Sequence, residues 1–146
     1  MATDFKKTYM KPKTNQPKVI GEWVEMKFMV RAAESGLLVS KPFGDSARFD
    51  FVVGCSRRLH RVQVRGTSFF ANGRAYLVSL QHGKPALPYS ASDFEFLAAF
   101  VMPFEAWYII PMTIIPDGKR TVTLYPHQRH SEAPLEKFRE AWRLLR

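Results

Sequence analysis

The sequence has only one cysteine and no long hydrophobic run. Because Cys55 is the only cysteine in 146 residues, an internal disulfide and a zinc site made of several thiolates are excluded. No apolar run reaches the roughly 20 residues that a membrane helix needs, and no positively flanked apolar segment opens the chain. We therefore expect a soluble, cytoplasmic protein that does not enter a membrane.

Acidic residues are scarce relative to basic ones. The 13 Asp and Glu residues stand against 22 Lys and Arg residues, which gives a formal charge of +9. A positive field of this kind attracts nucleic acids or anionic membranes, and charge alone does not choose between them. The chain is also 46% hydrophobic, which is enough for one packed core at this length.

The first 18 residues are basic and are interrupted by Pro12 and Pro17, which oppose regular structure. The sequence therefore predicts a flexible basic arm at 1–18 and a single domain at 19–146. Such an arm either contacts phosphate groups or only keeps the terminus solvated. Its lysines are Lys6, Lys7, Lys11, Lys13 and Lys18.

Helical spacing predicts a helix over residues 19–35 that ends at Gly36. Glu22 falls within the predicted apolar face, where an unpaired carboxylate is costly, so it is a candidate metal ligand. The alternative is a position at the rim, where Glu22 interacts with the helix dipole or with an arginine. Glu25 lies at the edge of the same face and is the weaker candidate. The apolar face consists of Trp23, Met26, Met29, Val30, Ala32 and Ala33.

The segments FDFVV (49–53) and RVQVR (61–65) predict a β-hairpin. With the period of two that strands impose, Asp50 points away from its aromatic neighbours, and Gln63 and Arg65 point away from the valines. The hairpin then has one apolar face and one face that carries an acid, an amide and a guanidinium. The alternative for each polar residue is an ordinary solvent-facing strand position.

The rest of the chain predicts more strands and one helix. A strand at 75–80, after an Asn-Gly turn, is expected to extend the first hairpin into a meander. Two further hairpins are expected, one from 94–102 and 106–111 and one from 113–116 and 120–126. A last helix is expected from Ser131, and its apolar stripe belongs either to the core or to a contact with a second subunit. The stripe consists of Leu135, Phe138, Trp142 and Leu145.

Basic and aromatic residues surround the proposed polar face and are candidates for contacts with nucleic acid. The alternative is a solvated basic surface over a core that contains the aromatic rings. An RNA-binding domain that stacks bases on Phe69 and Phe70 is a further alternative. His127 and His130 lack the additional ligands that a zinc site requires. The nucleic-acid-binding candidates are Lys41, Arg48, Arg61 and Arg74.

The segment from Gly21 to Arg65 resembles the core of the PD-(D/E)XK nuclease superfamily. That pattern consists of a helix acid, a strand Asp, and an acid-X-Lys on the next strand. The chain is most similar to the branch that resembles group I intron homing endonucleases, in which Gln replaces the second acid; here the motif reads Gln-X-Arg. Residues 90–111 and 136–145 also resemble this branch. The resemblance implies an α/β, restriction-endonuclease-like core with a central mixed sheet flanked by helices.

The resemblance implies a metal-dependent DNA endonuclease that uses Mg²⁺ or Mn²⁺. Asp50 would be the main metal ligand, with Glu22 reaching the ion directly or through water and Gln63 offering its amide oxygen. Arg65 would stand at the lysine position and stabilise a phosphate. Small nucleases of this kind commonly act as a homodimer or a higher homo-oligomer, which is implied here too.

Arg65 is where the sequence departs from the pattern. An arginine remains charged and presents a wide planar fork, so a role that needs a neutral amine is closed to it. With Gln63 also neutral, the site carries one negative charge fewer than the usual pattern. The competing hypothesis is therefore a nuclease-fold DNA-binding module that is catalytically weak or inactive.

Overall fold

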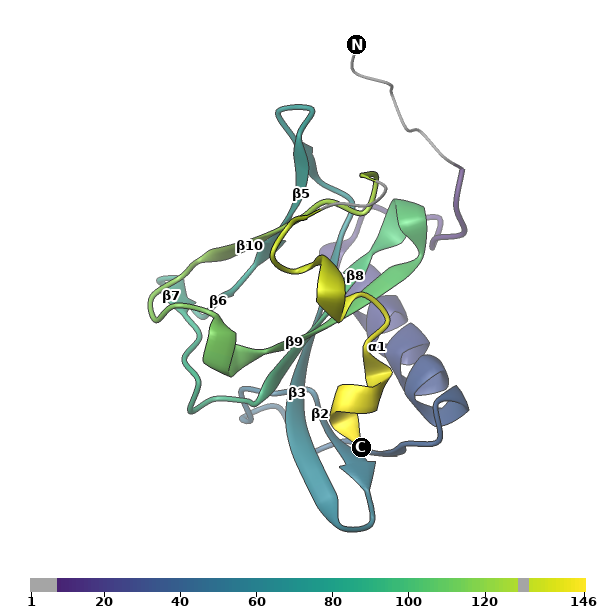
Figure 1. Ribbon diagram of the computed structural model, residues 1–146, viewed down its shortest axis with the longest axis vertical. Helices are drawn as coiled ribbons and strands as arrows, with labels where there is room; N and C mark the ends of the chain where they lie inside the picture. The colour runs from purple at the N-terminus through teal and green to yellow at the C-terminus, as the bar shows by residue number, and fades with distance from the viewer. Residues whose placement is uncertain (1–7, 129–131) are drawn as a thin grey trace.

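The computed structural model describes residues 8–128 and 132–146. Its central sheet consists of β1 (Leu38–Ser40), β2 (Phe51–Cys55), β3 (Arg58–Thr67), β8 (Phe96–Val101) and β9 (Ala106–Pro111). The strand order is β1-β2-β3-β8-β9 (Figure 1). Strands β3 and β8 pair in parallel, and the other neighbours pair antiparallel. The predicted α/β fold with a central mixed sheet is confirmed.

The helix α1 (Pro17–Glu34) covers one face of the central sheet (Figure 1). It begins inside the segment predicted as an arm, because a proline is well tolerated in the first helical turn. It ends next to Gly36, whose φ of 77° suits a residue without a side chain. The predicted helix is therefore confirmed, with its start moved to Pro17.

The predicted apolar face of α1 is only partly correct, because Ala32 is buried and Trp23 and Met29 pack against the core, but other members of that face are exposed. The buried residues are Val24, Phe28 and Ala32, spaced four apart, whereas Met26 and Val30 are 53% and 59% exposed. Spacing identifies which residues share a face of a helix, but packing decides which face turns inward. Here the Phe28 ring decides, since it packs against three other aromatic rings. Those rings are Phe51, Trp107 and Trp142.

A second sheet covers the other face of the central sheet. It has the order β10-β5-β4 and consists of β10 (Thr121–Leu124), β5 (Ala75–Ser79) and β4 (Phe70–Ala71). The predicted meander is therefore wrong, because β5 pairs with β4 and β10 and not with β3. Both edges of β3 are already occupied by β2 and β8. A short ladder of β6 (Gln81–His82) and β7 (Leu87–Pro88) completes the strands.

Of the two later hairpins, one is confirmed and one is wrong. Strands β8 and β9 pair antiparallel on either side of the 3-10 turn η1 (Met102–Phe104). The segment after β9 instead forms the 3-10 turn η2 (Met112–Ile114), and β10 pairs with the distant β5. A long-range partner thus displaces the local hairpin.

The predicted C-terminal helix is also wrong. The segment forms two 3-10 turns, η3 (Glu136–Phe138) and η4 (Trp142–Leu145), separated by Glu140 in a left-handed conformation with φ 52°. The Glu140 amide donates to the Trp107 carbonyl at 2.7 Å, and the Trp107 amide donates to Glu140 Oε1 at 3.1 Å. Pairing with β9 therefore replaces helical bonds. Ser131 lies outside the described residues.

The apolar stripe predicted for this segment is nevertheless part of the core. Phe138, Trp142 and Leu145 are buried, and Leu135 is half-buried against the part of the core that contains Phe138. Lys6 and Lys7 of the predicted arm lie outside the described residues. Within the part of the chain that the structure describes, no helix is long and apolar enough to cross a bilayer.

Candidate active site

An open cavity of about 510 Å³ lies between the N-terminal half of α1 and strand β3. The ionisable side chains in its lining are Glu25, Asp50 and Arg65, and the Gln63 amide lies among them. The structure thus brings together the acid, the amide and the arginine that the sequence singled out on the hairpin.

Asp50 is held in place by backbone bonds to β3. It immediately precedes β2, and its amide donates to the Val62 carbonyl at 2.9 Å. Its Oδ2 accepts a hydrogen bond from the Val64 amide at 2.8 Å. These two bonds fix the carboxylate beside the strand that carries Gln63 and Arg65.

The charge of Asp50 is poorly compensated. Burial raises the pKa of Asp50 to about 6, against the lowering effect of the Val64 hydrogen bond. The nearby Glu25 carboxylate also raises this pKa, whereas Arg65 and Lys41 lower it. A carboxyl group with a raised pKa in a cavity is a typical feature of a functional site.

The helix contributes Glu25 to this cavity, and Glu22 lies elsewhere. Glu22 is exposed and is not among the cavity residues, so the prediction that it lies in the buried face is wrong. Glu25 is half-buried and lines the cavity. Residues three apart differ by about 60° around a helix, and the inward rotation set by Phe28 favours the later acid.

Gln63 lies in the middle strand of the central sheet. It lies in β3 between β2 and β8 and is 6% exposed. Its neighbours in sequence, Val62 and Val64, contribute to the apolar core under α1. Alternation along the strand therefore separates the amide from the core, as the sequence predicted.

The Arg65 side chain is directed toward the segment that contains Gln81 and Tyr89. Its Nη2 donates to the Gln81 carbonyl at 3.0 Å and to the Tyr89 hydroxyl at 2.9 Å. The guanidinium also lies 5.6 Å from the centre of the Tyr89 ring. Its Nε is buried without a hydrogen-bond partner, and no ion pair joins Arg65 to Asp50 among the described residues.

A lysine approaches the cavity acids from another element. Lys41 follows β1, and its Nζ lies 3.4 Å from Glu25 Oε1 and 5.5 Å from the centre of the Phe51 ring. The antiparallel register explains this, because Ser40 pairs with Val52 and the next step places Lys41 beside Phe51. The sequence reasoning missed this contact. Only the pairing of β1 with β2 could have revealed this contact, and the sequence does not show which strands pair.

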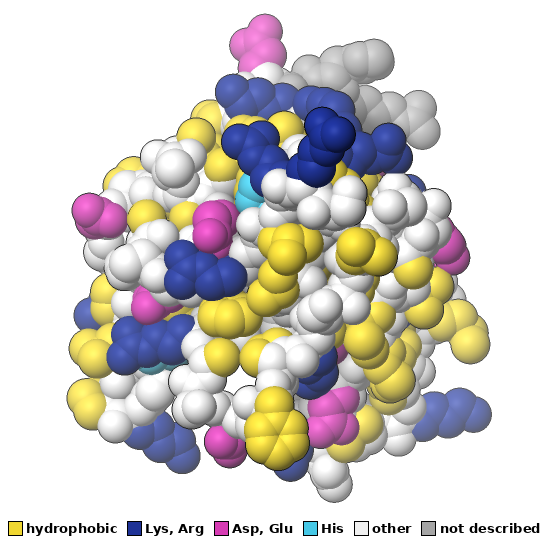
Figure 2. All heavy atoms as spheres, turned by 90° about the horizontal axis from the view of Figure 1, so that it is seen from below, with side chains coloured by type: hydrophobic (Ala, Val, Ile, Leu, Met, Phe, Trp, Pro, Cys, Tyr) yellow, Lys and Arg dark blue, Asp and Glu magenta, His cyan; other side chains and the backbone are white. Residues whose placement is uncertain are grey.

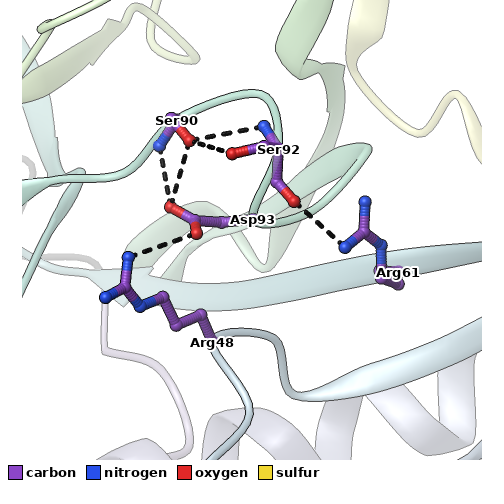
Figure 3. Close-up of polar contacts among 5 residues, drawn as sticks. All are labelled: Arg48, Arg61, Ser90, Ser92 and Asp93. Carbon is purple, nitrogen blue, oxygen red and sulfur yellow. Dashed lines mark hydrogen bonds and ion pairs between the residues drawn. The ribbon is translucent and has the colours of Figure 1, made fainter.

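Two other predicted nucleic-acid contacts are engaged within the protein (Figure 3). Arg48 Nη1 lies 3.4 Å from Asp93 Oδ1. Arg61 Nη1 donates to the Ser92 carbonyl at 3.0 Å, and Arg61 Nε donates to Glu95 Oε2 at 2.9 Å. Both arginines thereby anchor the loop before β8. That loop contains Asp93 and Glu95, so both of its acids are paired with these arginines.

Arg74 and two aromatic rings remain accessible. Arg74 is exposed on the turn between β4 and β5, and its side chain makes no ion pair with the described residues. Phe43 is fully exposed, and Phe69 is 64% exposed at the cavity. Phe70 packs against Tyr76, with 4.9 Å between the ring centres.

The basic side chains do not form one continuous field on the face seen in Figure 2. Lys and Arg side chains gather at one margin there and are otherwise interspersed with acidic and hydrophobic side chains. The net charge of +9 therefore attracts polyanions to the molecule as a whole. The basic side chains on this face do not mark one continuous path for a polyanion.

Comparison with known proteins identifies the family. The model of the PD-(D/E)XK endonuclease family matches residues 15–145. The chain belongs to the PD-(D/E)XK endonuclease family. Its structure is similar to that of a bacterial homing endonuclease, I-Ssp6803I, with a TM-score of 0.75 and 24% identity over 90% of this chain and 91% of that one. A search of curated proteins finds no match.

The donor atoms in this cavity fit a hard divalent cation. Among residues 8–128 and 132–146, no group of three or more His, Cys, Asp or Glu side chains is placed to hold a metal. The cavity instead offers the carboxylates of Asp50 and Glu25 and the amide of Gln63. Oxygen ligands of this kind suit Mg²⁺, which keeps several of its waters. His130 lies outside the described residues.

Proposed function

We propose that this protein is a metal-dependent endonuclease that hydrolyses phosphodiester bonds in DNA. The observation that carries the proposal is the convergence of Asp50, Glu25 and Gln63 on one cavity in a chain of an endonuclease family. The three residues come from a loop, a helix and a strand, so this convergence is a product of the fold. The positive net charge supports a polyanionic substrate.

Asp50, Glu25 and Gln63 would hold Mg²⁺ or Mn²⁺ in this cavity. A bound cation of this kind polarises the phosphate and lowers the pKa of a bound water. The Val64 amide orients Asp50, and the ion pair with Lys41 orients Glu25. Glu25 takes the role that the sequence assigned to Glu22.

Lys41 and Arg74 are the basic residues that we propose for contact with the DNA backbone. Both are exposed, whereas Arg48 and Arg61 are bound to the loop before β8.

Cleavage of both strands needs two sites of opposite orientation, so we also propose a homodimer or a higher homo-oligomer. Light scattering at working concentration tests this assembly.

One observation favours the competing function, a nuclease-fold DNA-binding module without strong catalysis. The lysine position of the family pattern is Arg65, and its guanidinium is bound to Gln81 and Tyr89. If no other cation serves the site, the reaction lacks one stabilising charge. Such a module would keep its DNA affinity in the presence of a chelator.

The deciding experiment compares two acids on the same helix. Plasmid and linear duplex are incubated with Mg²⁺ or Mn²⁺ and with the natural protein, Asp50→Asn, Glu25→Gln or the matched control Glu22→Gln. We expect about a 100-fold or greater loss of cleavage for the first two variants and little change for the control. If the natural protein and all three variants bind DNA without metal and none of them cleaves it, the binding module would be favoured. A loss confined to Glu22→Gln would overturn the role of Glu25.

A further inference from the structure

The residue at the lysine position is committed to a structural role. Arg65 gives Nη2 to the Gln81 carbonyl and to the Tyr89 hydroxyl and packs against the Tyr89 ring. Turning the guanidinium toward Asp50 would break both hydrogen bonds and leave the partly buried Gln81 carbonyl without this donor. The Arg65 guanidinium is therefore hydrogen-bonded to the segment that contains β6 and β7. This segment lies on the opposite side of β3 from α1.

Lys41 has the properties that Arg65 lacks. Its Nζ is 3.4 Å from Glu25 Oε1, and Glu25 shares the cavity with Asp50. Its side chain is 60% exposed, and its flexible four-carbon stem lets the ammonium move through solvent. Its positive charge also acts on Asp50, whose pKa it lowers. Lys41 is thus a mobile cation beside both acids.

We infer that Lys41, and not Arg65, supplies the cation that contacts the scissile phosphate. This inference rests on the proposed endonuclease function. In the reaction a water oxygen bonds to phosphorus, and the bond from phosphorus to one sugar oxygen breaks. The attacking water gives one proton to solvent, and the departing sugar oxygen takes one from solvent. Lys41 leaves Glu25 and donates a hydrogen bond to a non-bridging phosphate oxygen, and it stays protonated throughout.

The first test compares Lys41→Met with the matched control Lys27→Met. Lys27 lies on α1 with its Nζ 5.2 Å from the Trp23 ring centre, and it lines a different groove. We expect Lys41→Met to lose about 100-fold in single-turnover cleavage. Lys27→Met should cleave like the natural protein. The Mn²⁺ affinity of Lys41→Met, measured by calorimetry without DNA, should stay within a few-fold of the natural value.

Chemical rescue then distinguishes loss of the Lys41 ammonium group from damage to the fold. Lys41→Cys is made in a Cys55→Ser background, because Cys55 is partly exposed and would also be alkylated. Treatment with 2-bromoethylamine converts the new cysteine to a thioether analogue of lysine. We expect the treatment to restore most of the lost cleavage. The Cys55→Ser protein with Lys41 intact, treated in the same way, should not change.

The outcomes distinguish this inference from the function on which it rests. If Asp50→Asn is inactive and Lys41→Met cleaves like Lys27→Met, the endonuclease stands and the role of Lys41 is overturned. Loss of cleavage in Arg65→Met, with a normal melting temperature and with Lys41→Met active, would assign the cation to Arg65. If the natural protein cleaves no better than Asp50→Asn, the endonuclease proposal fails, and this inference fails with it.

Discussion

The backbone amide of Val64 donates a 2.8 Å hydrogen bond to Asp50 Oδ2, yet the pKa of Asp50 is raised to about 6. A hydrogen bond to the charged form lowers the pKa of a carboxyl group, so burial outweighs that bond here. The nearby Glu25 adds to the rise. The site therefore holds its main acid in place without neutralising its charge, and this state has measurable consequences.

The first prediction concerns stability against pH. Because the pKa of Asp50 is higher in the folded chain than the ordinary 3.8, the folded state binds more protons between about pH 4 and 6. The free energy of unfolding should therefore fall as pH rises through that window, by about 3 kcal/mol from this group. Asp50→Asn removes the titration and should be the more stable protein at neutral pH. Urea unfolding of both proteins across this range checks it, and parallel curves would contradict it.

The second prediction concerns metal affinity against pH. A divalent cation binds Asp50 only after its proton has left, so protons compete with the metal below the pKa of about 6. Mn²⁺ affinity should fall by up to about tenfold for each pH unit below that value and level off above it. Calorimetric titration of the protein without DNA measures this. An affinity that stays constant down to about pH 4 would remove Asp50 from the ligand set.

The third prediction concerns the attachment of Arg65. Tyr89→Phe removes one of the two hydrogen bonds of Nη2 and keeps the ring beneath the guanidinium. The free energy of unfolding should fall by about 1 kcal/mol, because a partly buried donor loses one partner. DNA cleavage should stay near the natural rate. A large loss of cleavage at unchanged stability would place Arg65 in the reaction.

The fourth prediction concerns the contact of α1 with β3 next to the cavity. A side chain at Gly66 would lie 2.8 Å from Val24 Cγ2 and 2.9 Å from Met102 Cε. Gly66→Ala should therefore lower the free energy of unfolding by about 1–3 kcal/mol, since the helix must move outward. The matched control Gly21→Ala meets open space within α1 and should raise it by about 0.5–1 kcal/mol. Equal effects in urea unfolding would contradict this contact.

Part of the candidate site was readable in the sequence. Strand alternation placed Gln63 and Arg65 on the face opposite the valines, and the structure brings both to the cavity with Asp50. The hairpin of β2 and β3 and the hairpin of β8 and β9 were also predicted, since each is closed by nearby residues. These features depend on interactions between residues that are close in the chain.

The sequence did not show which acid of α1 faces the cavity. Glu22 and Glu25 lie one turn apart on α1, and only the burial of Phe28 against three aromatic rings decides which acid faces the cavity. The pairing of β5 with β10 and the contact of Lys41 with Glu25 were hidden for a related reason. In each case the partner is distant in sequence, and no local pattern identifies it.

The sequence by itself thus determined the charge through its composition, and its family resemblance implied the class of fold. It also determined the strand that carries Gln63 and Arg65 and the acid that precedes this strand. Local backbone geometry is enough for these last two features, because the period of a strand acts over a few residues. The tertiary structure alone decided that Glu25 joins Asp50, that Arg65 is bound to Tyr89, and that Lys41 stands beside the acids. Those outcomes depend on how α1 rotates against the sheet and on how distant strands pair, which the packing of the whole core sets.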